Sequence, residues 1–146
     1  MNVNWLRISS ILAIVVMLCS CKERKHDQSE IESAMKYYDH LVLKLDADSI
    51  SRLYTEDGNL GDVAIGRDAI KDFLSSFNDV KVLSQVSTTT SIVITADTAI
   101  QKGEYVQSDL IGGKETVQVT GEYTTRWQWT KDEGWRIKKM YTKTTN

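Results

Sequence analysis

Four long β-prone segments separated by very short turns fill the second half of the chain, and they limit the fold more than any other feature. From Val80 onward the sequence is rich in Val, Ile, Thr, Tyr and Trp, which favour extended strands. Two- and three-residue turn signals interrupt it at Ala96-Asp97, Gly112-Gly113 and Asp132-Glu133-Gly134. Such short connections join antiparallel neighbours. The sequence therefore predicts an antiparallel meander with strands at residues 82–95, 98–110, 117–130 and 135–144.

The third and fourth segments each alternate between an apolar and a polar face. One face of the third carries Gly121, Tyr123, Thr125, Trp127 and Trp129. The last segment repeats the pattern, with Trp135, Ile137 and Tyr141 on its apolar side. Arg136 and Lys138 fall on the polar side, which we assign to solvent. A sheet with one apolar face needs other elements packed against that face.

The first half of the chain supplies those elements. Between Ser29 and Leu45 apolar residues recur every three or four positions, which predicts an amphipathic helix with Ser29 and Glu32 as a capping box. Two shorter helices are expected within residues 45–77, with Asp48 and Gly66 at their starts and a glycine-rich loop between them. Helices followed by strands predict an α+β fold, with the N-terminal helices packed in a strongly curved antiparallel sheet.

Size, charge and composition narrow the possible functions. A chain of 146 residues with 41% hydrophobic residues suits one domain. The net charge of -2, with both signs mixed along the chain, argues against a nucleic-acid partner. Only two cysteines and two histidines are present, and the carboxylates have no metal-ligand spacing. We therefore expect neither a metal site nor a cofactor.

The N-terminus has the pattern of a secretory signal. Arg7 precedes an apolar run from Ile8 to Leu18, which is shorter than the roughly 20 residues that span a bilayer. The end of this run, Leu18-Cys19-Ser20-Cys21, resembles a bacterial lipobox. That resemblance implies cleavage before Cys21 and lipid attachment to it; a transmembrane anchor is the alternative.

The lipobox reading also divides the chain. Residues 1–20 would be the signal peptide, 21–28 a charged tether, and 29–146 a single α+β domain. The protein would be bound to the membrane through its lipid anchor in the cell envelope. Because Lys22 is not an aspartate, resemblance to such lipoproteins implies the outer membrane of a Gram-negative bacterium.

An ordered set of motifs gives a family resemblance over residues 31–141. Tyr38 is followed by L-D-A-D-S-I-x-x-L-Y-T-E-D-G, G-R-D-A-I-x-x-F, G-E-Y, G-E-Y-T-T-R-W and G-W-R-I. This order resembles the nuclear-transport-factor-2-like superfamily, especially its SnoaL-like small bacterial members. The resemblance implies a cone of three helices in a curled, cystatin-like sheet, with a pocket at the wide end. It also implies that a homodimer can form through the sheet.

Three functions are compatible with that resemblance. The preferred one is binding of a small apolar or amphipathic molecule without catalysis. Its pocket would be lined by Tyr38, Tyr54, Asp62, Phe73, Tyr105, Tyr123 and Trp127. Another is a dimeric protein-interaction module.

The remaining function is that of an isomerase or cyclase similar to the ketosteroid isomerases. In it Tyr38 would be the oxyanion donor and Asp62 the base, with Glu122 the only carboxylate near the position of a second acid. The same residues also have a purely structural explanation. Asp62 follows Gly61, where aspartate is a common turn residue, and Tyr38 continues the apolar stripe of its helix.

Overall fold

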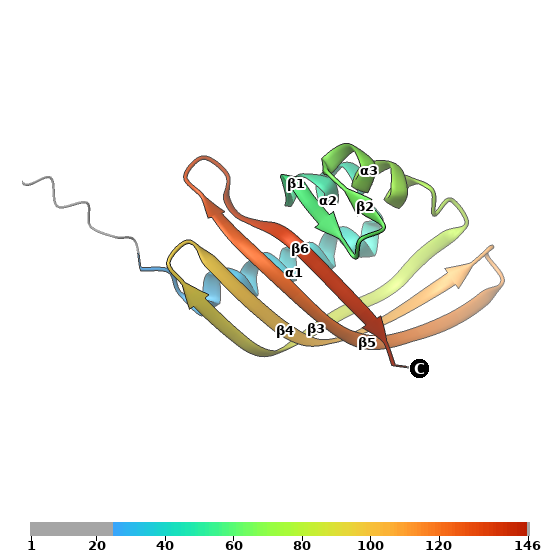
Figure 1. The fold of residues 1–146 in the computed structure, drawn as a ribbon. Coiled ribbons are helices and arrows are strands. Elements are labelled where there is room, and N and C mark those ends of the chain that lie inside the picture. The colour runs from blue at the N-terminus through green and yellow to red at the C-terminus, as the bar shows by residue number, and fades with distance from the viewer. Residues whose placement is uncertain (1–24, 146) are drawn as a thin grey trace, which may run out of the picture.

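A six-stranded sheet curls around the first helix in the computed structural model, which describes residues 25–145 (Figure 1). In chain order the elements are α1 (Gln28–Lys44), α2 (Ala47–Arg52), β1 (Tyr54–Leu60), β2 (Ala64–Ile65), α3 (Arg67–Ser75), β3 (Val80–Thr95), β4 (Thr98–Ile111), β5 (Glu115–Thr130) and β6 (Gly134–Thr144). All three helices lie on one side of the curved sheet (Figure 1). The predicted α+β class is confirmed.

The sheet is mixed rather than wholly antiparallel. Its strand order is β2-β1-β6-β5-β4-β3, and β3 to β6 form the predicted meander. The region between α2 and α3, predicted as a loop, instead contains β1 and β2, and β1 runs parallel to β6. Tyr54 pairs with Ile137, whose amide donates to the Leu53 carbonyl at 2.8 Å. This long-range pairing makes a strand of a segment whose polar, glycine-containing sequence predicts a loop.

Helix starts differ from the prediction by one or two residues. Asp27 caps α1 by accepting from the Ser29 amide at 2.8 Å, so the predicted Ser29–Glu32 capping box does not form the cap. Asp46, rather than Asp48, caps α2. Gly66 precedes α3 as expected, with φ of 88°. Each of these two helix starts has more than one residue that can form an N-cap, and the first of them in the chain, Asp27 in α1 and Asp46 in α2, forms it.

Three β-bulges lie in the meander of β3 to β6, and each adds to the bend of its strand. Register shifts fall at Leu83 and Thr90 in β3, and a third falls at Lys138 in β6. The bulge in β6 inverts the facing of the residues after it: Met140 is only 2% exposed, whereas Tyr141 is 53% exposed. The prediction that Tyr141 lies on the apolar face is therefore wrong, because alternation carries through a strand only where no residue is inserted.

The two G-E-Y motifs lie opposite each other in antiparallel strands. Gly103 of β4 pairs with Tyr123 of β5, and Tyr105 of β4 pairs with Gly121 of β5. A Cβ atom on Gly103 would lie 2.6 Å from the Tyr123 hydroxyl, and one on Gly121 would lie 2.7 Å from Cε1 of Tyr105. Each tyrosine ring thus lies over the glycine of the neighbouring strand, on the concave face.

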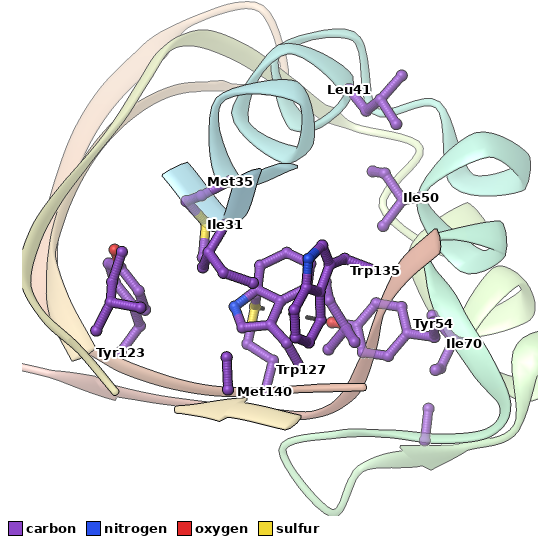
Figure 2. Packing of buried hydrophobic residues seen from close by; sticks show 14 residues of the cluster. Ile31, Met35, Leu41, Ile50, Tyr54, Ile70, Tyr123, Trp127, Trp135 and Met140 are labelled. Atoms are coloured by element: carbon purple, nitrogen blue, oxygen red, sulfur yellow. Dashed lines mark hydrogen bonds between the residues drawn. The ribbon is translucent and has the colours of Figure 1, made fainter. Parts of the chain in front are cut away.

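Aromatic side chains fill the narrow end of the cone. Trp127 and Trp135 lie beside Ile31 and Tyr54 in the core (Figure 2). The His26 ring, with its side chain 1% exposed, lies 4.6 Å from the Trp129 ring and 4.7 Å from that of Trp135. The folded domain therefore begins before Ser29, and the prediction of a tether reaching residue 28 is wrong for its last residues.

A buried hydrogen-bonded chain connects this core to the wider part of the cone. Trp127 donates from Nε1 to Oε1 of Gln101 at 2.9 Å, and Gln101 donates to Oγ1 of Thr89 at 2.8 Å. The hydroxyls of Thr89 and Tyr123 lie 3.3 Å apart. Gln101 is fully buried, and these partners satisfy its amide where water cannot.

Candidate functional site

A cavity of about 460 Å³ lies between the helices and the concave face of the sheet. It begins beyond the aromatic core, where α1 from Met35 onward and α3 separate from the far ends of β3 and β4. Most of its wall is apolar, formed by Met35, Val42, Leu45, Ile50, Leu60, Phe73, Leu74, Phe77, Val80, Val82, Ile111 and Met140. This size and lining are typical of small-molecule sites.

Three tyrosines from different elements line the cavity: Tyr38 of α1, Tyr105 of β4 and Tyr123 of β5. Burial raises the pKa of Tyr38 to about 12, although a hydrogen bond with Tyr54 acts in the opposite direction. Burial likewise raises the pKa of Tyr123. Both phenols are therefore protonated at neutral pH and can donate a hydrogen bond into the cavity.

The cavity wall also contains a buried carboxylate, Asp109. The residue is 8% exposed, and Nε2 of Gln107 lies 2.9 Å from each of its carboxylate oxygens. Its partners across the sheet are Val82 and Val117, so neither adjacent strand places a positive charge opposite it. Asp109 is an acceptor with remaining capacity at the edge of an apolar space.

A second group of acceptors lies where α1 meets β3. Asp39 accepts from the amide and hydroxyl of Ser87 at 2.9 and 2.7 Å, and from Nε2 of Gln85 at 3.1 Å. That contact fixes the orientation of the Gln85 amide, because its NH₂ group must face the carboxylate. Oε1 of Gln85 is then buried without a hydrogen-bond partner among the described residues, and Gln85 lines the cavity.

The structure brings four of the seven predicted lining residues together: Tyr38, Phe73, Tyr105 and Tyr123 all face the cavity. Tyr54 and Trp127 lie behind its wall, at 0% and 1% exposure. The Tyr54 hydroxyl donates to the sulfur of Met140 at 3.7 Å, and its burial raises the pKa of Tyr54 well above the usual value. These two residues support the lining without forming it.

Asp62 is outside the cavity, and its predicted role is wrong. It occupies the tight turn between β1 and β2 with φ of 61°, and its side chain is 61% exposed. Nζ of Lys139 and Nδ2 of Asn59 each donate to it at 2.8 Å, and these hydrogen bonds lower the pKa of the Asp62 carboxyl. A solvated carboxylate with a lowered pKa is a poor general base. Because Asp62 lies outside the cavity, it also does not pair with Tyr38.

The outer face of the sheet has a different character. Glu122, the predicted second acid, is exposed there opposite Glu104 and Lys143. A shallow hollow of about 530 Å³ on this face contains the ion pair of Asp57 and Lys138. Exposed apolar residues are also present, in the cross-strand pairs Val86–Val106 and Val93–Ile100. The homodimer expected from the resemblance stays a prediction.

The polar part of the cavity was missed from the sequence, although a signal for it exists. Period-two alternation along β4 places Gln101, Tyr105, Gln107 and Asp109 on one face, with Gly103 between them. The opposite face carries Ile100, Val106 and Leu110, so hydrophobicity alone favours the wrong face. Only the positions of Gly103 and Tyr105 relative to β5 would have identified the concave side.

The described part of the chain has neither a metal-binding group nor a membrane-spanning helix. Within residues 25–145, no three His, Cys, Asp or Glu side chains are grouped so that they could hold a metal ion. The helices of the same region are all too short or too polar to cross a bilayer.

Comparison with known proteins agrees with the geometry. The family model of the SnoaL-like domain matches residues 23–141. A ketosteroid isomerase-like protein from Erwinia carotovora atroseptica superposes with a TM-score of 0.74 at 18% identity, covering 84% of this chain and 99% of that one.

Two further structures share the fold. An NTF2-like protein with a cystatin-like fold from Novosphingobium aromaticivorans gives a TM-score of 0.68 at 19% identity, covering 82% of each chain. An NTF2-like superfamily protein from Salmonella enterica serovar Typhimurium gives 0.69 at 13% identity, covering 82% of this chain and 91% of that one. No curated protein matched. The chain belongs to the SnoaL-like domain family.

Proposed function

We propose that the domain binds a small amphipathic molecule in the cavity between α1, α3 and the concave face of the sheet. The observation that carries this proposal is the cavity itself, about 460 Å³ of space with an apolar wall and a few converging polar groups. The polar groups come from α1, β3, β4 and β5, so the sheet and the helix jointly fix their positions. Loss of the Asp62–Tyr38 pair removes the basis for the isomerase alternative.

Filling part of the cavity should weaken binding. The uncharged dye N-phenyl-1-naphthylamine, whose fluorescence rises in apolar sites, serves as the probe. We expect saturable binding to the wild-type protein and at least about tenfold weaker binding to Val42→Trp, because the larger side chain occupies the space that the dye needs. Fluorescence titration measures both affinities.

The neighbouring residue provides the matched control. Leu43 lies on the outer side of α1, is 42% exposed and does not line the cavity, so Leu43→Trp should bind the dye like the wild type. Circular dichroism checks that both variants are folded. Equal affinity of Val42→Trp and wild type would place the dye elsewhere and contradict the proposal.

We also propose that the domain is held at the cell envelope by lipid on Cys21. Support comes from the lipobox-like sequence Leu18-Cys19-Ser20-Cys21 and the apolar run before it. These residues lie outside those that the structure describes. The anchor would be separate from the binding site, because the described residues that line the cavity begin at Met35.

The anchor can be tested by fractionation. In a Gram-negative host, the wild-type protein should appear in the membrane fraction, and mass spectrometry should find diacylglycerol on Cys21. Cys21→Ala should move the protein to the soluble fraction or leave the signal uncleaved, whereas Cys19→Ala should remain lipidated. Unmodified Cys21 in the membrane-extracted wild type would refute the anchor.

A further inference from the structure

The charge of the cavity wall has one sign. Among the described residues that line the cavity, none is Lys, Arg or His, and Asp109 is the one carboxylate. Asp39 adds a second negative charge directly behind Gln85 and Ser87. A buried carboxylate normally has a charged partner or several donors, and Asp109 has only the Gln107 amide among the described residues.

The polar atoms of the wall with unused hydrogen-bonding capacity are acceptors, which agrees with its negative charge. Oε1 of Gln85 is buried without a donor, and the Asp109 carboxylate has remaining lone pairs. A ligand that supplies N–H groups would satisfy these acceptors. A ligand with a carboxylate or phosphate would meet like charge and find no cationic side chain.

We propose that the ligand is an amphipathic amine whose ammonium group binds Asp109 while its hydrocarbon part occupies the apolar wall. This inference rests on the proposed binding function and names its ligand class. The rings of Tyr105 and Tyr123 line the same cavity and can present their negative faces to a cation. Leu74 and Phe77, on the helical side, supply apolar surface for the remainder of the ligand.

Three probes of equal length separate charge from hydrophobicity: 4-phenylbutylamine, 4-phenylbutan-1-ol and 4-phenylbutyrate. At pH 7 the first is a cation, the second neutral and the third an anion. Isothermal titration calorimetry on the wild-type protein should give at least about tenfold tighter binding of the amine than of the alcohol, because the ammonium pairs with a poorly solvated carboxylate. The carboxylate should bind most weakly.

Substitution of Asp109 tests the assignment of that preference. In Asp109→Asn the amine and the alcohol should bind within about twofold of each other, and alcohol affinity should stay near the wild-type value, which also shows that the cavity is intact. Asp72→Asn is the matched control: it removes the same charge from an exposed position on α3 and should keep the amine preference.

The outcomes distinguish this inference from the function on which it rests. Tight N-phenyl-1-naphthylamine binding combined with equal affinity for the three probes, or preference for the carboxylate, overturns the amine assignment alone. An amine preference that persists in Asp109→Asn also overturns it. Failure of the dye and of all three probes to bind overturns the proposed function together with the inference.

Discussion

Gly103→Ala should destabilise the domain by about 3 kcal/mol, the upper end of the usual cost of overpacking. The added methyl group would lie 2.6 Å from the Tyr123 hydroxyl and nearer still to the Thr88 backbone carbonyl. A rotamer change can move the hydroxyl, but the carbonyl belongs to the β3–β4 pairing and can move only if the strands separate. Urea denaturation, followed by tryptophan fluorescence, measures the free energy of unfolding.

Gly113 provides the control for this effect. It lies in the β4–β5 turn with φ of 68°, and a Cβ atom there would meet nothing within 4 Å. Asparagine tolerates this left-handed conformation better than most residues, so Gly113→Asn should cost less than about 1 kcal/mol. Similar losses in the two variants would mean that general loss of glycine flexibility, rather than the close approach of Tyr123 and Thr88, determines the stability.

Met140→Ala should cost about 3 kcal/mol, whereas Tyr141→Ala should change the free energy of unfolding by no more than about 0.5 kcal/mol. The bulge at Lys138 turns Met140 into the core, at 2% exposure, and Tyr141 outward, at 53%. Met140 also supplies the sulfur that accepts from the Tyr54 hydroxyl. Chemical denaturation of both variants under the same conditions gives the comparison.

This pair of variants tests the facing of the last strand directly. Uninterrupted alternation from Trp135 and Ile137 predicts Tyr141 inside, which would reverse the expected order of the two losses. A greater loss in Tyr141→Ala would therefore contradict the bulge. Lys143→Ala, at an exposed position further along β6, is a control for the general effect of truncating a side chain in this strand.

The sequence predicted most of the fold because its local patterns are long and consistent. Burial in β5 alternates strictly from Gly121 to Trp127, and the helical stripe from Ile31 to Leu41 continues through α1. β1 could not be predicted in the same way, since its strand conformation depends on pairing with β6, about 80 residues away. The bulge at Lys138 is equally invisible, because one inserted residue leaves no composition signal.

The candidate site could be predicted only in part, for a related reason. Tyr38 and Tyr123 could be predicted because each lies on the apolar face of its helix or strand, and Tyr105 because it is an aromatic residue in the β-prone half of the chain. The resemblance selected Asp62, whereas Asp109, which is also an aspartate beside an apolar residue in the sequence, was not predicted. Tertiary structure separates them: one lies in an exposed turn with Lys139, and the other is buried on the concave face.

Because His26 packs between two tryptophans, it limits the distance between the domain and a lipid anchor at Cys21. If Cys21 carries the lipid, four residues separate it from His26, and the five Cα–Cα steps can span at most about 18 Å. The start of α1 would then lie near the bilayer surface. The described cavity lining begins at Met35, in the middle of this 17-residue helix, so the anchor would hold the domain at the membrane from outside the described cavity wall.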